Sequence, residues 1–137
     1  MIEFSTLTGA CMIALGYNYA GLFCNSEKLR DKLIENSGYF GESLWEMPFD
    51  KSIEEGLKGA YSDIVNSTKQ RYGGAIEAAE FLKYFVNEGV EWAHIDIAGV
   101  AEDKKIPSKS NQPYSSGFGV STILNFFKND IMDAWYN

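Results

Sequence analysis

The sequence predicts an α/β protein in which helices flank a layered sheet. Apolar segments short enough to be buried strands alternate along the chain with segments whose apolar residues recur at helical spacing. The chain has 137 residues, of which 45% are hydrophobic and 15% are aromatic. Such values are typical of one globular unit with an ordinary core. We therefore expect residues 1–137 to lie in a single domain.

The amino-terminal segment predicts a strand followed by a short helix. Residues 1–8 are apolar and partly β-branched, which favours extended backbone. Gly9–Leu15 is a compact apolar stretch, and Gly16 should end it because glycine often terminates helices.

A buried strand and a longer helix should come next. Tyr19–Cys24 is apolar and short, as expected of a strand inside a sheet. Asn25 and Ser26 then supply a capping signal for a helix that reaches about Asn36. The apolar face of this helix would contain Leu29, Leu33 and Ile34.

The middle of the chain has fewer regular features. Gly38 and Gly41 interrupt it, and Asp50–Leu57 is compatible with a short helix that has an acidic first turn. Gly56–Gln70 is polar and contains glycine, so we expect it to be mostly loop.

A second amphipathic helix should begin at Gly74 and be closed by Gly89. Its apolar positions recur at helical spacing and are Ile76, Ala79, Leu82, Phe85 and Val86. The charged residues between them should face solvent, and they are Glu77, Glu80 and Lys83.

The last third predicts a central strand, a loop and a helix. Trp92–Val100 is almost continuously apolar, as expected of a strand covered on both faces. Ser108–Gly119 is rich in turn residues, and Val120–Asp133 returns to helical spacing.

Composition disfavours several classes of function. The net charge is −7 and the twelve Lys and Arg residues are scattered, so a nucleic-acid surface is not expected. No apolar run approaches the roughly 20 residues that cross a bilayer, and Glu3 stands where a signal peptide would be basic. Cys11 and Cys24 form no metal or disulfide pattern, so we expect buried, reduced thiols and a cytoplasmic location.

His94 and Asp96 are the first candidates for chemistry, because residues two apart on a strand share a face. Together with Ser116 they suggest a hydrolytic triad, but no nucleophile elbow surrounds the serine. A metal site would need a third ligand nearby. A hydrogen-bonded core histidine is the favoured interpretation.

Other motifs carry weaker signals. Gly73 and Gly74 precede a helix and suggest an anion site, although no lysine follows at P-loop spacing. The pairs Glu54/Glu55 and Glu77/Glu80 suggest paired carboxylates, for which solvated helix faces are the better explanation. Asp63 and Asp103 lie in polar segments without an evident partner.

Four longer strings, in this order and spacing, resemble the leucyl (cytosol) aminopeptidases, specifically the carboxy-terminal part of their catalytic domain. The strings are FSTLTGA at residues 4–10, continuing to YAGLFCN at 19–25; GESLWEMPF at 41–49; GGAIEAAEFLKYFV at 73–86 with WAHIDIAGVA at 92–101; and SGFGVSTILNF at 116–126. The resemblance covers residues 2 to 127 and implies that residues 1–137 are one partial α/β domain. Glu3, Ser5, Cys24, residues 56–70 and residues 114–115 depart from the family pattern.

The resemblance implies hydrolysis of the amino-terminal residue of peptides by two divalent cations, commonly zinc, manganese or magnesium. It also implies a homo-oligomer, hexameric in active members. Within this chain it implies that the Leu7 carbonyl receives the substrate amine and that Thr6 and Gly9 line the pocket for the first side chain. Ala98 and Ala101 match other pocket positions, where small residues leave room for a leucine-sized group. Tight packing by small residues is the alternative explanation for these positions.

The family's metal ligands and its catalytic lysine and arginine all precede the TLTGA string, so the resemblance assigns no catalytic or metal residue to this chain. We therefore expect the chain to be inactive alone. An alternative is a non-catalytic remnant that serves as an assembly or peptide-binding module. An unpaired sheet edge and apolar surface would favour self-association in either case.

Overall fold

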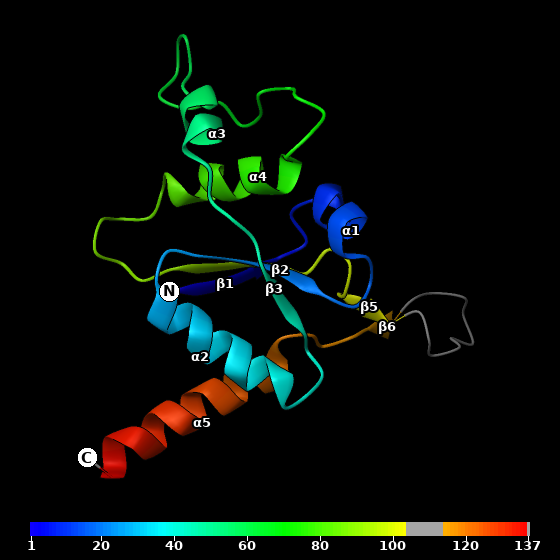
Figure 1. The fold of residues 1–137 in the computed structure, drawn as a ribbon, viewed down its shortest axis with the longest axis vertical. Helices are drawn as coiled ribbons and strands as arrows, with labels where there is room; N and C mark the ends of the chain where they lie inside the picture. The colour runs from blue at the N-terminus through cyan, green and yellow to red at the C-terminus, as the bar shows by residue number, and fades with distance from the viewer. Residues whose placement is uncertain (104–113, 137) are drawn as a thin grey trace.

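The computed structural model describes residues 1–103 and 114–136 (Figure 1). The strands are β1 (Ile2–Ser5), β2 (Ala20–Cys24), β3 (Leu44–Glu46), β4 (Ala93–Asp96), β5 (Glu102–Asp103) and β6 (Tyr114–Ser115). The helices are α1 (Gly9–Leu15), α2 (Glu27–Gly38), α3 (Lys51–Gly56), α4 (Gly74–Lys83) and α5 (Val120–Tyr136).

A mixed four-stranded sheet lies at the centre of the fold, with the strand order β1-β4-β2-β3. β4 pairs in parallel with β1 and antiparallel with β2, while β3 pairs in parallel with β2. All four residues of β4 are buried. The expected central strand is therefore confirmed, although regular pairing is limited to Ala93–Asp96. β5 and β6 form a separate two-stranded ribbon.

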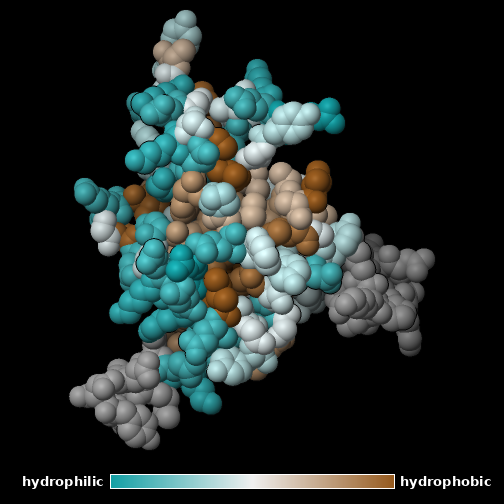
Figure 2. Space-filling model, in the orientation of Figure 1, coloured by the Kyte–Doolittle hydropathy of each residue, from teal (hydrophilic) through white to brown (hydrophobic). Residues whose placement is uncertain are grey.

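Helices cover both faces of this sheet, as Figure 1 shows, so the predicted α/β layer structure is confirmed. α2 and α5 pack against each other on one face, and α1, α3 and α4 lie on the other. Leu22, Leu33 and Ile95 are fully buried in the core between the sheet and the first group of helices, and Phe23 and Ala79 are fully buried in the core on the other face. In Figure 2, hydrophilic residues dominate the surface of α2 and α3, and hydrophobic residues are exposed over α1.

Capping side chains fix the starts of three helices. The Thr8 hydroxyl accepts a hydrogen bond from the Cys11 amide, the Ser26 hydroxyl from Leu29, and the Asp50 carboxylate from the amide of Ser52. The predicted helices at residues 9–15, 25–36 and 50–57 are thus confirmed to within one or two residues. Ile34 is 38% exposed, so α2 buries a narrower face than its pattern suggested.

The α4 helix is shorter than its apolar pattern predicts. It ends at Lys83, and the chain continues through tight turns to Gly89, whose φ of 79° is a conformation that glycine adopts readily. Phe85 lies beyond the helix and is 63% exposed. The short strands β3, β5 and β6 were not predicted, because two or three residues carry too little periodicity. Residues 108–113 of the expected loop lie outside the described residues.

The prediction that Glu77 and Glu80 face solvent is wrong. Both are buried, with relative exposures of 8% and 2%. The reason is that α3 and the loops beside it fold over this side of α4. The Glu80 carboxylate accepts from the Asp50 amide at 2.7 Å and from the Lys83 ammonium at 2.9 Å. The Glu77 carboxylate accepts from the Thr68 amide at 3.1 Å.

Candidate functional site

The carboxyl ends of β1 and β4 lie side by side at one edge of the sheet. The two strands are parallel, and Ser5 is in register with Asp96, so residues 6–9 and 97–101 leave the sheet next to each other (Figure 1). In α/β proteins, ligands commonly bind beyond the carboxyl ends of parallel strands. The resemblance assigned substrate contacts to residues that all lie in these two segments, namely Thr6, Leu7, Gly9, Ala98 and Ala101.

A buried carboxylate joins the two segments, and we call this arrangement the Asp96 clamp. One Asp96 oxygen accepts from the Thr8 amide at 3.1 Å and from the Thr8 hydroxyl at 2.7 Å. The other accepts from the Ala98 amide at 3.1 Å. Asp96 is completely buried, and hydrogen bonds to an ionised group are among the stronger ones. The clamp therefore fixes the geometry of both segments.

The predicted substrate residues differ in how they are exposed. Thr6, Leu7 and Gly9 face solvent, whereas Ala98 and Ala101 are half-buried. A Cβ atom added at Gly9 would have no neighbour within 4 Å, so open space lies beside it.

Gly99, between the two alanines, is in a different situation. A Cβ atom there would lie 2.1 Å from the Gly16 carbonyl oxygen. The segment 97–101 is thus pressed against the end of α1, and Val100 is buried in the core. Tight packing accounts for Gly99, while the more open positions beside it are available for contact with a ligand.

The Cys11 thiol lies behind the clamp and is a poor nucleophile. It is buried and donates a weak hydrogen bond to the Asp96 carbonyl oxygen at 3.7 Å. Burial, together with the nearby Asp96 charge, raises the pKa of Cys11 to about 11. The thiol therefore stays protonated at neutral pH, and its position is that of a packed core residue.

His94 is a hydrogen-bonded core residue. Its ring stacks on Phe23 and Trp92, with centroid distances of 5.6 and 6.3 Å, and its Nδ1 atom hydrogen bonds the carboxylate of Glu3. Glu3, one of the departures from the family pattern, thus has a structural partner.

The triad considered from the sequence does not form. The Asp96 carboxylate is hydrogen bonded to Thr8 and Ala98. The Ser116 hydroxyl donates to the Val100 carbonyl at 2.5 Å. Each of the three side chains therefore has a structural role in place of a catalytic one.

A metal site is not assembled by the residues that the structure describes. Across residues 1–103 and 114–136, no three His, Cys, Asp or Glu side chains come together as a cation would require. The donor atoms of Asp96 and the Nδ1 atom of His94 already have hydrogen-bond partners. The described residues alone thus do not fit the pair of cations that the resemblance implies.

The proposed anion site at Gly73 and Gly74 is not supported by the geometry. Glu77 lies in the first turn of α4, where its own negative charge already complements the helix dipole. A Cβ atom at Gly74 would lie 3.3 Å from that of Ala10, so this glycine allows α4 to pack closely on α1.

Sequence reasoning missed the Asp96 clamp. The sequence pattern pairs Asp96 with His94, as a triad member or a metal ligand, and places Thr8 at the end of a strand. A threonine directly before a short apolar helix is a capping signal, and an aspartate at the end of a buried strand needs donors nearby. These two signals together would have indicated that the two segments meet.

Comparison with known proteins matches the chain to one family. The model described as "Cytosol aminopeptidase family, catalytic domain" matches residues 1–124. A probable cytosol aminopeptidase of Prochlorococcus marinus (strain MIT 9211) is 47% identical over 134 residues, covering 96% of this chain and 26% of the relative. Leucine aminopeptidase 2, chloroplastic, of Arabidopsis thaliana is 44% identical, covering 94% of this chain and 21% of the relative.

A solved structure of similar fold is the bottromycin maturation enzyme BotP in complex with Mn. It aligns with a TM-score of 0.83 and 33% identity, covering 93% of this chain and 28% of that one. The chain thus spans about a quarter of the length of the relatives that it matches. Within the described residues, no helix is long and apolar enough to cross a membrane.

Proposed function

We propose that this chain, which belongs to the cytosol aminopeptidase family, forms a wall of the site that holds the first residue of a peptide in a leucyl aminopeptidase-type hydrolase. The Asp96 clamp is the observation that carries the proposal. It brings residues 6–9 and 97–101, which are about 90 residues apart in the sequence, to one sheet edge. These are the segments to which the family resemblance assigns substrate contacts.

The chemistry of these segments suits recognition of a peptide amino end. The Leu7 backbone carbonyl accepts a hydrogen bond from the substrate ammonium. The hydrogen bond from the Thr8 amide to Asp96 holds the loop in place for this contact. The side chain of the first residue lies against Thr6, Gly9, Ala98 and Ala101. Open space beside Gly9 and the small alanine side chains leave room for a branched aliphatic group such as leucine.

The hydrolytic step needs metal ligands that the described part of this chain does not bring together. We propose that the two divalent cations of the reaction are held by residues outside the chain, since no three candidate ligand side chains come together among the described residues. The chain's own contribution is to bind and orient the peptide. The 137 residues alone should therefore not hydrolyse peptides.

We also propose that the protein lies in a reducing compartment and that its active form is a homo-oligomer. Two free cysteines without a disulfide suit the cytoplasm, and relatives are named as cytosol or chloroplastic aminopeptidases. The β3 edge of the sheet, with the exposed side chain of Trp45, offers surface for assembly.

A chimeric enzyme tests this function. The quarter of the Prochlorococcus marinus relative that this chain matches is replaced by residues 1–137, and hydrolysis of leucine anilide is measured with added manganese. We expect turnover, and we expect Gly9→Val to raise KM at least tenfold by filling the space for the first side chain. Gly38→Val is the matched control, because a Cβ atom there also meets nothing within 4 Å. A folded, manganese-loaded chimera without activity, or equal kinetics for both variants, would contradict the proposal.

A further inference from the structure

One large apolar side chain of α1 points away from the fold. Ile13 is 90% exposed, whereas the residues before it in the helix face packed surfaces. Cys11 is buried in the core, and Ala10 lies close to Gly74 at the start of α4. Single exposed apolar side chains are common on proteins, so the position of Ile13 decides whether it has a role.

Ile13 lies next to the open space of the candidate site. Gly9 and Ile13 are four residues apart on α1, so they share one face of the helix with Cβ positions about 5–6 Å apart. Helical side chains lean toward the amino end of their helix, so the Ile13 side chain covers the turn that starts at Gly9. A Cβ atom at Gly9 would meet nothing within 4 Å. Ile13 therefore borders this space without filling it.

The two segments of the site offer no charged side chain to a ligand. Residues 4–26 contain no Asp, Glu, Lys or Arg, and neither do residues 97–101. The Asp96 carboxylate between them is completely buried and accepts hydrogen bonds from Thr8 and Ala98. A charged ligand group placed here would lose water without gaining a partner. The wall therefore suits an apolar group.

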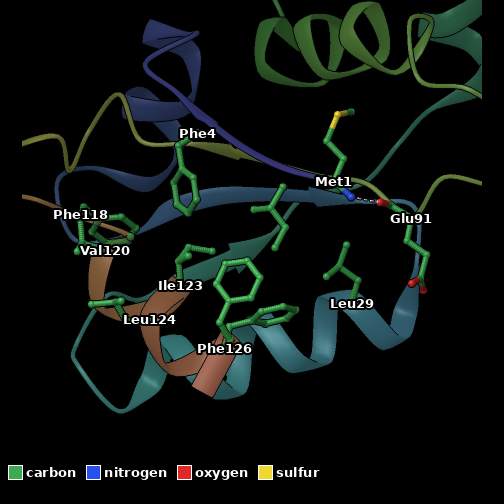
Figure 3. A pocket seen from close by; sticks show the side chains of 12 residues that line it. Met1, Phe4, Leu29, Glu91, Phe118, Val120, Ile123, Leu124 and Phe126 are labelled. Atoms are coloured by element: carbon green, nitrogen blue, oxygen red, sulfur yellow. Dashed lines mark hydrogen bonds between the residues drawn. The ribbon is translucent and has the colours of Figure 1, made fainter. Parts of the chain in front are cut away.

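A larger apolar surface is separate from this one. A groove of about 850 Å³ lies on the face of the sheet covered by α2 and α5, and Figure 3 shows Phe4, Leu29 and Ile123 around it. α1 lies on the opposite face (Figure 1). A ligand held beside Gly9 therefore meets Ile13 and not the groove.

We propose that Ile13 is a specificity-determining residue, whose side chain contacts the side chain of the first residue of the peptide and favours leucine and methionine over alanine and lysine. The inference rests on the proposed function and adds to it a residue that the family resemblance does not assign. An alanine side chain beside Gly9 is too short to reach Ile13, whereas longer aliphatic side chains cross the gap. Each methylene group buried in this way improves binding roughly fourfold.

The single-chain chimera tests the proposal through its choice of substrate. The ratio kcat/KM is measured with added manganese for the anilides of leucine, methionine, alanine and lysine. We expect Ile13→Ala to lower kcat/KM about tenfold for leucine and methionine and less than about twofold for alanine. A smaller folded fraction would lower all values by one factor, so the ratio between substrates reports contact alone.

A charge at the same position should change the preference. Ile13→Glu should raise the kcat/KM of lysine anilide relative to leucine anilide about tenfold or more, because the carboxylate supplies the missing partner for the ammonium. Ala14→Glu is the matched control, since Ala14 is exposed on the same helix but points about 100° away round its axis. It should change the ratio less than about threefold.

Two results overturn the inference. One is an Ile13→Ala variant that loses activity by the same factor on all four anilides, which would mean a purely structural role. The other is an equal change of the lysine-to-leucine ratio in Ile13→Glu and Ala14→Glu. In either case turnover by the chimera leaves the proposed function standing.

An inactive chimera removes the proposed hydrolase function, and calorimetry then tests Ile13 by itself. L-Leucinamide should bind the folded chimera about tenfold more tightly than glycinamide, and Ile13→Ala should remove most of that difference. Equal affinities of the wild-type chimera and Ile13→Ala for L-leucinamide would overturn the inference.

Discussion

The carboxyl end of β1 and the outer side of β1 differ in how far their contacts are made within the chain. At its carboxyl end, the strand leads into a segment whose polar groups are satisfied within the chain by the Asp96 clamp. Along its other side, β1 pairs with none of the described strands and borders an apolar groove lined by residues that include Phe4, Leu29 and Leu124. The contrast teaches that contacts within the chain hold the candidate substrate wall in place, whereas the apolar surface next to it has no such contacts among the described residues.

The largest effect should come from breaking the clamp. Asp96→Asn keeps the shape of the side chain but removes the charge and leaves the Thr8 and Ala98 donors competing for one oxygen. We expect a loss of about 3 kcal/mol in the free energy of unfolding, measured by urea denaturation. Asp63→Asn, in an exposed loop, is the control and should change little. Equal stability of both variants would show that the clamp does not hold the two segments.

Two neighbouring phenylalanines of α5, both of which line the groove, differ in how deeply they are buried. Phe126→Ala should destabilise the chain by about 3 kcal/mol, because its side chain is buried among α2 and the sheet. Phe127→Ala should cost less than about 1 kcal/mol, because that side chain is 54% exposed. Thermal unfolding of the two variants measures the difference. Similar losses would mean that the groove side of α5 is already packed.

Two glycines compare packing with open space inside the candidate site. Gly99→Ala places a methyl group against the Gly16 carbonyl and should destabilise by about 1–3 kcal/mol. Gly9→Ala meets no neighbour and should be close to neutral in stability. Urea midpoints of the two variants provide the test, and a destabilising Gly9→Ala would count against free space beside the loop.

The smallest effect concerns pH and the side of α4 that was predicted to face solvent. Burial acts to raise the pKa of Glu77, but hydrogen bonds from Thr68 and Ser67 outweigh it and hold the pKa below the ordinary 4.5. A lowered folded pKa contributes stability that is present above the unfolded pKa and is lost as pH falls through the folded one. Between about pH 5 and pH 3, wild type should therefore lose more stability than Glu77→Gln. Parallel urea curves for the two proteins, with equal losses, would exclude this contribution.

Much of the fold followed from local patterns in the sequence. Ser26 and Asp50 marked helix starts, and the apolar run at Trp92–Val100 marked the central strand, because caps and strand burial leave short-range signals. The five candidate substrate residues came from the family resemblance, and their meeting at one sheet edge depends on β1–β4 pairing across about 90 residues. No local pattern encodes that pairing. The burial of Glu77 and Glu80 was missed for the same reason, since distant loops cover them.

The most direct test of the account is hydrolysis of leucine anilide by the purified 137-residue chain with added manganese, together with elemental analysis for bound metal. The account predicts no turnover and no stoichiometric metal, because the chain supplies the wall of the site and the cation ligands belong elsewhere. Turnover with stoichiometric manganese would contradict it, and would require a metal site built from the acids and the histidine of this chain.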